Sequence, residues 1–221
     1  MCGRYALHSH PSVVALQFGL AQVPDFAPRY NIAPGADVLI VRETPGGRVA
    51  ETVRWGLIPA WARDPEIGRR LNNARLETAH EKPSFRAAMR QRRCIIPADG
   101  FYEWQPGPRG KQPFYVHPAH GGLFAFAGLY ETWAGPDGPV ATCAILTTEA
   151  NDHMRRIHDR MPAILVPDAY GQWLAMGLQD GLAARALLAP WPVAETASRP
   201  VSTRVNNAKN EGEELIGALP G

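Results

Sequence analysis

The chain has 221 residues with 45% hydrophobic and 20% charged side chains and a formal net charge of +2, which suits a single domain with one substantial core. No apolar run approaches the roughly 20 residues that span a bilayer, and Arg4 and His8 interrupt any signal-peptide pattern at the start. Three cysteines without paired spacing argue against a disulfide scaffold and a structural zinc site, and for a reducing, cytoplasmic setting.

The first half of the chain predicts a helix, a hairpin and a second helix. Residues 10–20 have helical apolar spacing that ends near Gly19. Two apolar runs, 38–41 and 49–53, flank turn formers at 44–47 and predict a hairpin, whereas 30–35 predicts a turn-rich loop. Ser84 is the expected cap of a helix over 85–92. This helix would carry Arg86, Arg90 and Arg93 on one face.

The second half predicts mainly strands. Apolar runs bounded by Gly and Pro predict strands at 94–97, 101–104, 113–116, 123–133, 140–147, 163–166 and 201–205. Helical segments are expected at 151–158, 168–176 and 182–188. No repeat or linker divides the chain. We therefore expect one α+β domain over residues 1–221, with a mainly antiparallel, barrel-like β core flanked by short helices.

Cys2 is a candidate reactive residue. Initiator Met is removed before a small second residue, and removal of Met1 would leave an α-amine and a thiol on one Cα. Their reference pKa values are about 8 and about 8.5, so a useful fraction of each is deprotonated at neutral pH. Such an aminothiol condenses with an aldehyde through a Schiff base to a thiazolidine, or acts as an N-terminal nucleophile. An inert cysteine is the alternative.

Arginine and tryptophan residues indicate a polyanion site. Of the 23 basic residues, 20 are Arg. Between residues 63 and 93, eight Arg and Lys82 stand against four carboxylates, a local excess of +5. The planar guanidinium fork fits phosphate, although a GC-rich genome also explains the Arg total and explains the clustering less well. Trp55, Trp61 and Trp104 border Gly or Pro in predicted loops, and either pack in the core or stack on unpaired bases.

Three polar segments interrupt the apolar pattern. Asn72 and Asn73 precede an Arg in a stretch that turn chemistry alone predicts as a turn. Glu103 lies between two aromatic residues; it either faces water or faces a pocket, where desolvation would raise its pKa and suit acid–base work. His158 lies beside a carboxylate and a guanidinium and suits proton transfer, although a lone His is more often structural. The other His residues lack metal-ligand spacing, so no metal site is expected.

Six sequence blocks occur in a fixed order along the chain. They are Met-Cys-Gly-Arg-Tyr at 1–5, Tyr-Asn-Ile-Ala-Pro at 30–34, Trp-Gly-Leu-Ile-Pro at 55–59, Asn-Ala-Arg-Leu-Glu at 73–77, Cys-Ile-Ile-Pro-Ala-Asp-Gly-Phe-Tyr-Glu-Trp at 94–104 and His-Asp-Arg-Met-Pro at 158–162. Val-Asn-Asn at 205–207 fits the same series. The ordered set is highly specific, and it resembles the SRAP family of abasic-site processing proteins.

The resemblance implies the SRAP fold and a covalent trap for abasic DNA. The product would be a thiazolidine between Cys2 and the ring-opened abasic sugar, which shields the lesion from strand cleavage. By resemblance, Cys2 is the nucleophile, Asn73 orients its neighbourhood, Glu103 handles protons near the α-amine, and His158 assists sugar-ring opening and Schiff-base chemistry. The implied DNA contacts are Arg4, Pro34, Trp55, Arg75 and Trp104.

The resemblance also implies the partners and setting of the chain. The expected partner is single-stranded DNA with abasic sites, or a single-strand/duplex junction, and the chain would act as a monomer. No cofactor, metal or membrane is implied. The protein would lie in the cytoplasm and at the nucleoid when bound to DNA. Peptidase-like self-processing, which here would expose Cys2, belongs to the same expectation.

Two other functions stay open from the residues alone. An N-terminal-nucleophile amidohydrolase, such as a glutamine amidotransferase domain, also starts Met-Cys-Gly and would use Cys2 for acyl transfer. It gives no reason for the basic stretch. A non-covalent single-strand-binding module would use the Arg and Trp residues but leaves Cys2, Glu103 and His158 without a role.

Overall fold

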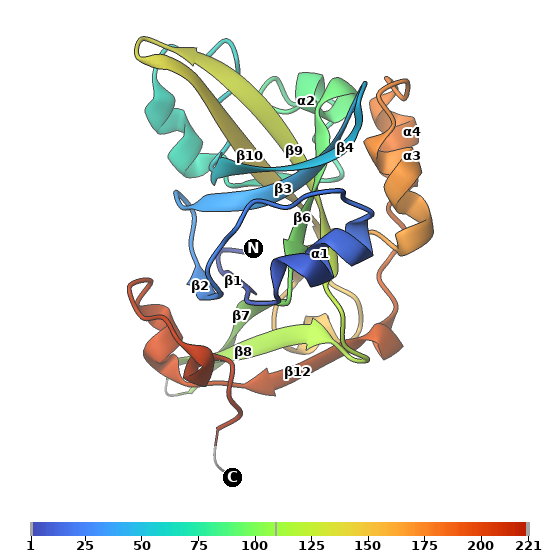
Figure 1. The fold of residues 1–221 in the computed structure, drawn as a ribbon. Helices are drawn as coiled ribbons and strands as arrows, with labels where there is room; N and C mark the ends of the chain where they lie inside the picture. Colours follow the sequence, from blue (N-terminus) through green and yellow to red (C-terminus); the bar gives the residue numbers. More distant parts are fainter. Residues whose placement is uncertain (1, 109, 220–221) are drawn as a thin grey trace.

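The computed structural model describes residues 2–108 and 110–219, and strands dominate it (Figure 1). The strands are β1 (Tyr5–Leu7), β2 (Arg29–Ile32), β3 (Asp37–Thr44), β4 (Gly47–Trp55), β5 (Asn73–Arg75), β6 (Arg93–Ala98), β7 (Gly100–Gly107), β8 (Gly110–Pro118), β9 (Phe124–Gly135), β10 (Gly138–Glu149), β11 (Arg160–Pro162) and β12 (Thr196–Pro200). The α-helices are α1 (Pro11–Phe18), α2 (Arg86–Gln91), α3 (Tyr170–Leu174) and α4 (Gly181–Ala186). Within the described chain, no helix has the length and apolar character needed to cross a bilayer.

Five strands close into a barrel. β10 pairs with β4, β4 with β3, β3 with β6, β6 with β9, and β9 returns to β10. The β10–β4 pairing is parallel and the others are antiparallel. Fully buried side chains such as Ile40, Cys94, Phe126 and Ile145 belong to the main core. The expected α+β fold with a mainly antiparallel, barrel-like core is therefore confirmed.

A second, five-stranded sheet lies below the barrel, in the order β12-β8-β7-β1-β2 (Figure 1). Asp99 alone separates the barrel strand β6 from β7, so the two layers are joined by continuous chain. Its carboxylate accepts the backbone N–H groups of His8 and Ser9, at 2.6 and 2.9 Å, which fixes the turn after β1. Gly100 follows, where an added Cβ would lie 2.5 Å from the ring of Tyr115. Strand β1 is held within this second sheet, between β7 and β2.

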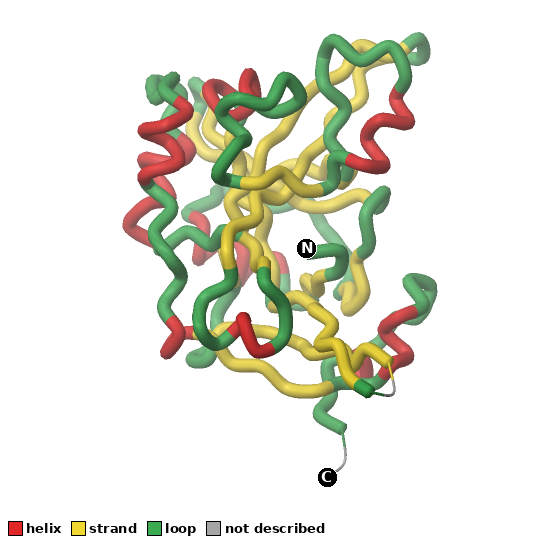
Figure 2. The backbone as a smooth tube through the Cα atoms, turned by 180° about the vertical axis from the view of Figure 1, so that it is seen from behind, coloured by secondary structure: helices red, strands yellow, loops and turns green. Residues whose placement is uncertain are grey.

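The short helices cover the outside of the strands. Seen from behind, strands fill the centre of the molecule and helices lie at its periphery (Figure 2). Arg93, the first residue of β6, is buried and donates to the backbone carbonyls of Met89, Arg90, Trp173 and Ala175. These carbonyls lie at the C-terminal ends of α2 and α3, where backbone oxygens lack partners within the helix. Arg93 donates the hydrogen bonds that these oxygens need. The expectation that Arg93 shares one helix face with Arg86 and Arg90 is wrong, because α2 ends at Gln91 and Arg93 begins β6.

Short elements differ most from the expectations. Residues 29–32 and 73–75, expected as loop and turn, are strands, because β1 and β10 offer them backbone partners. The expected strand at 163–166 is displaced to β11, the expected last strand is displaced from 201–205 to β12, and only a 3₁₀ turn, Met154–Arg156, forms within 151–158. The N-cap of α2 is Phe85 without a side-chain bond, so Ser84 is not its cap.

Candidate active site

Cys2 lies three residues before the first residue of β1, and its side chain is fully buried. Asn73 Nδ2 donates to the backbone carbonyl oxygen of Cys2 at 2.7 Å. Asn73 begins β5, and β10 fixes its place through the parallel partner Ile145. The Oδ1 atom of Asn73 is buried and has no hydrogen-bond partner among the described residues. A strand of three residues thus positions an amide on the backbone of the candidate nucleophile. Met1 lies outside the described residues, so its removal stays a prediction.

The thiol of Cys2 is harder to ionise than the sequence suggests. Burial raises its pKa well above the ordinary range, and the negative charge of Glu103 adds to the shift. Burial therefore opposes the thiolate fraction that the reference value of a solvated thiol suggests, and the fraction after loss of Met1 stays a prediction. Cys94 and Cys143 are also free and buried, and burial raises the pKa of each thiol. Cys2 differs from them through the hydrogen bond between its carbonyl oxygen and Asn73 and through the nearby charge of Glu103.

Glu103 lies on β7 and is 2% exposed, so the alternative in which it faces water is wrong. Burial raises the pKa of its carboxyl, and the nearby His158 partly offsets the shift. The distance between His158 Nε2 and Glu103 Oε2 is 3.9 Å. A buried carboxyl with a raised pKa beside an imidazole is an arrangement suited to general acid–base work.

The proton of neutral His158 is assigned by its backbone neighbour. The N–H of Arg160 donates to His158 Nδ1 at 3.0 Å, so Nδ1 is an acceptor and the proton of the neutral ring lies on Nε2, toward Glu103. Asp159 Oδ1 is 2.9 Å from the same Nδ1. That contact favours a protonated Nδ1, but the Asp159 side chain is 88% exposed and its charge is screened by solvent. The backbone bond therefore dominates in the neutral ring.

The side chain of Arg4 is hydrogen-bonded to the C-terminal part of the chain. Its Nη1 donates to Asn31 Oδ1 at 2.7 Å and to the carbonyl oxygen of Val205 at 2.6 Å. The buried Asn31 in turn donates through Nδ2 to the carbonyl oxygens of Asn207 and Asn210, at 3.0 and 2.8 Å. Arg4 therefore stabilises the N-terminal strand, in addition to any contact with DNA that its half-buried side chain makes.

The two tryptophans expected at DNA lie in different environments. Trp104 is half-buried on β7, where its Nε1 donates to Asn206 Oδ1 at 2.8 Å. Trp55 is the last residue of β4 and is completely buried. Its Nε1 donates to the carbonyl oxygen of Asn72 at 2.8 Å, and its ring packs edge-on against Tyr5 with centroids 5.4 Å apart. Trp55 therefore lies in a strand and in the core rather than in a loop; it lines a cavity together with Pro34, and its contact with DNA stays a prediction.

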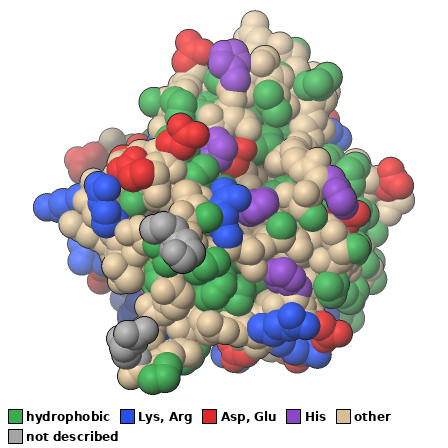
Figure 3. Space-filling model, turned by 90° about the horizontal axis from the view of Figure 1, so that it is seen from below, with side chains coloured by type: hydrophobic (Ala, Val, Ile, Leu, Met, Phe, Trp, Pro, Cys, Tyr) green, Lys and Arg blue, Asp and Glu red, His purple; other side chains and the backbone are tan. Residues whose placement is uncertain are grey.

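The remaining expected DNA contacts lie on the surface. Pro34 and Arg75 are exposed, and Pro34 borders a cavity of about 200 Å³ that Arg54 and Arg69 also line. Most basic side chains of the Arg-rich stretch are exposed as well, namely Arg63, Arg69, Arg70, Arg75, Lys82, Arg86 and Arg90. The face seen from below mixes basic, acidic and His side chains (Figure 3). This lower face therefore has no uniform positive charge.

Three residues of the site were not singled out from the sequence. Asn31 and Glu77 fall inside the blocks at 30–34 and 73–77, and Arg160 falls inside the block at 158–162. Block membership is the signal that could have found them, since residue type alone does not. No group of three or more His, Cys, Asp or Glu side chains is arranged to hold a metal ion in the part of the chain that the structure describes.

The chain is similar to known proteins over its whole length. Residues 1–208 match the profile of a family described as SOS response associated peptidase (SRAP). The abasic site processing protein YoqW of Bacillus subtilis is 44% identical over 222 residues, which cover 98% of this chain and 99% of that protein. The corresponding values for the abasic site processing protein YedK of Escherichia coli are 33%, 98% and 99%. A crystal structure of a Bacteroides thetaiotaomicron protein superposes with a TM-score of 0.89 at 25% identity and covers 99% of this chain and 100% of its own.

Proposed function

The chain belongs to the SRAP family, and from this premise we propose that it processes abasic sites in DNA by forming a covalent link through Cys2. The observation that carries the proposal is the setting of Cys2. Its backbone carbonyl oxygen accepts a hydrogen bond from the side-chain amide of Asn73. Glu103 lies close enough for its negative charge to raise the pKa of the Cys2 thiol. The imidazole of His158 lies 3.9 Å from that carboxyl.

The reaction needs an aldehyde and an aminothiol. Ring opening of the abasic deoxyribose supplies the aldehyde, and loss of Met1, which we propose as self-processing, supplies the α-amine of Cys2. The amine adds to the aldehyde carbon, water departs, and Sγ then adds to the resulting imine carbon to close a thiazolidine. The balance is one aldehyde and one aminothiol to one thiazolidine and one water. No cofactor takes part.

The buried groups divide the proton work. His158 Nε2–H donates the proton that the departing hydroxyl needs. Glu103, once ionised, accepts the thiol proton as Sγ attacks, which compensates for the raised pKa of the Cys2 thiol. Asn73 holds the carbonyl of Cys2 and so fixes the direction from which the amine and the thiol reach the sugar.

DNA is held by charge and stacking outside the buried site. The exposed Arg75 and its basic neighbours bind phosphates without reading sequence. The half-buried Trp104 offers a ring to an unpaired base. We propose single-stranded DNA or a single-strand/duplex junction as the substrate, because a flipped-out sugar must reach Cys2. The protein would act as a monomer in the cytoplasm, at the nucleoid when bound.

A denaturing gel with abasic single-stranded DNA tests the proposal. The protein should give a heat-stable adduct whose intact mass equals protein without Met1 plus DNA minus one water. Cys2→Ala should give no stable adduct, whereas its α-amine should still form a Schiff base that borohydride traps. Full crosslinking by a protein that retains Met1 would refute the mechanism.

The same experiment separates the two other functions. Ammonia release from glutamine without a DNA adduct would favour an amidohydrolase. Equal, reversible binding of abasic and intact strands without an adduct would favour a single-strand-binding module. Both arms use the same protein preparation, so a failed crosslink is not confused with an inactive sample.

A further inference from the structure

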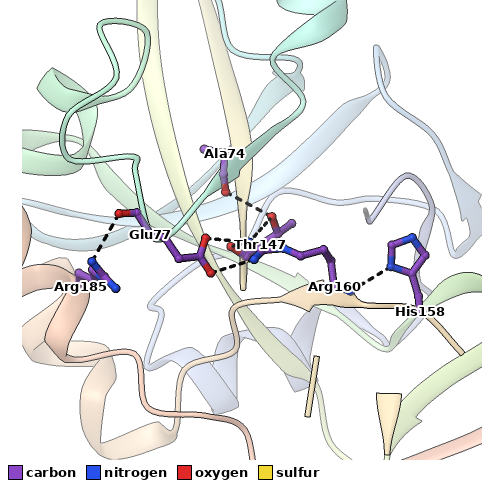
Figure 4. Close-up of polar contacts among 6 residues, drawn as sticks. All are labelled: Ala74, Glu77, Thr147, His158, Arg160 and Arg185. Atoms are coloured by element: carbon purple, nitrogen blue, oxygen red, sulfur yellow. Dashed lines mark hydrogen bonds and ion pairs between the residues drawn. The ribbon is translucent and has the colours of Figure 1, made fainter. Parts of the chain in front are cut away.

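The ion pair between Glu77 and Arg160 connects the segment after β5 with the segment that carries His158 (Figure 4). Both carboxylate oxygens of Glu77 accept from Arg160, at 2.8 Å from Nη1 and 2.9 Å from Nη2. Arg160 Nη2 also donates to the backbone carbonyl oxygen of Thr147 at 2.6 Å. The Arg160 side chain is 13% exposed and that of Glu77 33% exposed. A two-pronged, largely buried pair of this kind is geometrically specific.

Both ends of the pair lead to the proposed site. Glu77 lies two residues after β5, the strand whose Asn73 holds the backbone of Cys2. Arg160 begins β11, and its own backbone N–H donates to His158 Nδ1 at 3.0 Å. Strand β10 runs between them, since Thr147 pairs with Arg75 on one side and with Pro162 on the other. The pair therefore ties the segment of the nucleophile to the segment of the imidazole.

The pair matters because the elements that carry it are short. β5 and β11 have three residues each, and the segment between the 3₁₀ turn Met154–Arg156 and β11 carries His158. Without the side-chain anchor, the start of β11 would be held by local backbone contacts, chiefly the pairing of Arg160 with Glu149 and the bond from Ala150 N–H to the carbonyl oxygen of Asp159. Burial by itself would raise the pKa of Glu77, but Arg160 and Arg185 hold it below its usual value. The carboxylate thus stays charged, and the anchor stays intact, at neutral pH.

We propose that Glu77 and Arg160 are positioning residues for the crosslinking reaction. They hold the backbone N–H of Arg160 on His158 Nδ1, which keeps the proton of the neutral imidazole on Nε2 and directs it toward Glu103. Loss of the pair lets the ring turn and lets Nδ1 compete for the proton, with the exposed Asp159 as its partner. The kinetic consequence rests on the proposed function, whereas the state of the imidazole does not.

Nuclear magnetic resonance of the free protein tests the assignment directly. In ¹⁵N-histidine-labelled protein, the two ring nitrogens of His158 have different shifts when one carries the proton. We expect the Nε2–H form in the parent above the titration of the ring, and a mixture with the Nδ1–H form in Glu77→Gln and Arg160→Lys. An Nδ1–H form in the parent would overturn the proposal whether or not the variants fold.

Single-turnover crosslinking at saturating protein supplies the second readout. Glu77→Gln and Arg160→Lys should bind intact single strands like the parent but crosslink about 10-fold to 100-fold more slowly, because the acid group is misplaced. The limb of the pH–rate profile that belongs to His158 should shift in both variants. Asp152→Asn is the matched control, since it removes a carboxylate from an exposed Asp152–Arg155 pair in the same region.

The outcomes separate this role from the proposed function. Parental crosslinking rates and an unchanged Nε2–H signature in both variants would refute the positioning role. If the parent forms no adduct at all, the proposed function fails, while the ring-nitrogen shifts still decide whether Glu77 and Arg160 set the imidazole.

Discussion

Replacement of Trp55 by alanine distinguishes a core residue from a DNA-stacking residue. Trp55 is completely buried, so its truncation should cost about 3–5 kcal/mol of unfolding free energy through lost burial and a residual cavity. The carbonyl of Asn72 also loses its indole donor, which costs about 1–3 kcal/mol if water does not replace it. The Trp55→Ala variant should therefore lose about 4 kcal/mol or more, a large share of a typical domain's stability.

Trp55→Phe refines the magnitude. It keeps a ring against Tyr5 but loses the bond to Asn72, so about 1–3 kcal/mol should be lost. For a chain of this length, each kcal/mol lowers the melting temperature by about 2–4 °C. We expect Trp55→Phe to melt roughly 2–12 °C below the parent by circular dichroism, and to bind intact single strands with parental affinity at temperatures where it is folded.

Trp104→Ala is the matched control, because it should change DNA binding more than stability. Trp104 is half-buried and its bond to Asn206 lies at the surface, so its loss should change stability by about 1 kcal/mol or less while weakening binding to single strands. Fluorescence anisotropy with labelled DNA measures the affinity of all three variants. A Trp55→Ala protein as stable as the parent but defective in DNA binding would show that the core assignment is wrong.

Other predictions concern charge and protons. Burial raises the pKa of Glu103, so the free energy of unfolding falls as the pH rises above about 4.3, where the carboxyl ionises in the unfolded chain. Glu103→Gln should therefore be more stable than the parent at neutral pH and equally stable at lower pH. Urea unfolding at several pH values measures this difference. The same variant, and His158→Ala, should crosslink roughly 10²-fold more slowly in single turnover; parental rates would assign both residues a structural role. Arg75→Ala should weaken binding to abasic and intact strands alike and make the log–log salt slope shallower by about 0.7, whereas an unchanged slope would exclude a phosphate contact.

The sequence identifies the long strands well because their signals are local. The hairpin β3–β4 follows from two apolar runs around turn formers, and β6 and β7 follow from an apolar run and its aromatic continuation. Barrel closure also requires the parallel pairing of β10 with β4, whose partners Cys143 and Trp55 are far apart in the sequence. No periodicity within either strand specifies such a partner.

The site is harder to predict because distant contacts decide the fate of each side chain. The chemistry of Cys2, Glu103 and His158 is visible in the residues, whereas their proximity depends on three separate segments. Residue type favoured the core for Trp55 but left a nucleic-acid surface open, and the complete burial of its ring places it in the core. Asn73 lacks any strand signal, and its register against Ile145 places it.

The bond between Arg4 and Val205 has a consequence for how the protein is made. It joins positions 201 residues apart, and Asn31 reaches the carbonyls of Asn207 and Asn210, which are 176 and 179 residues away. A chain grows from its N-terminus at about 5–20 residues per second, so residue 205 is added on the order of 10–40 s after residue 4. During that interval the N-terminal strand lacks its C-terminal partner, although Asn73, which bonds the backbone of Cys2, has already been made. The contacts that hold the N-terminal strand are therefore complete only when synthesis is nearly finished.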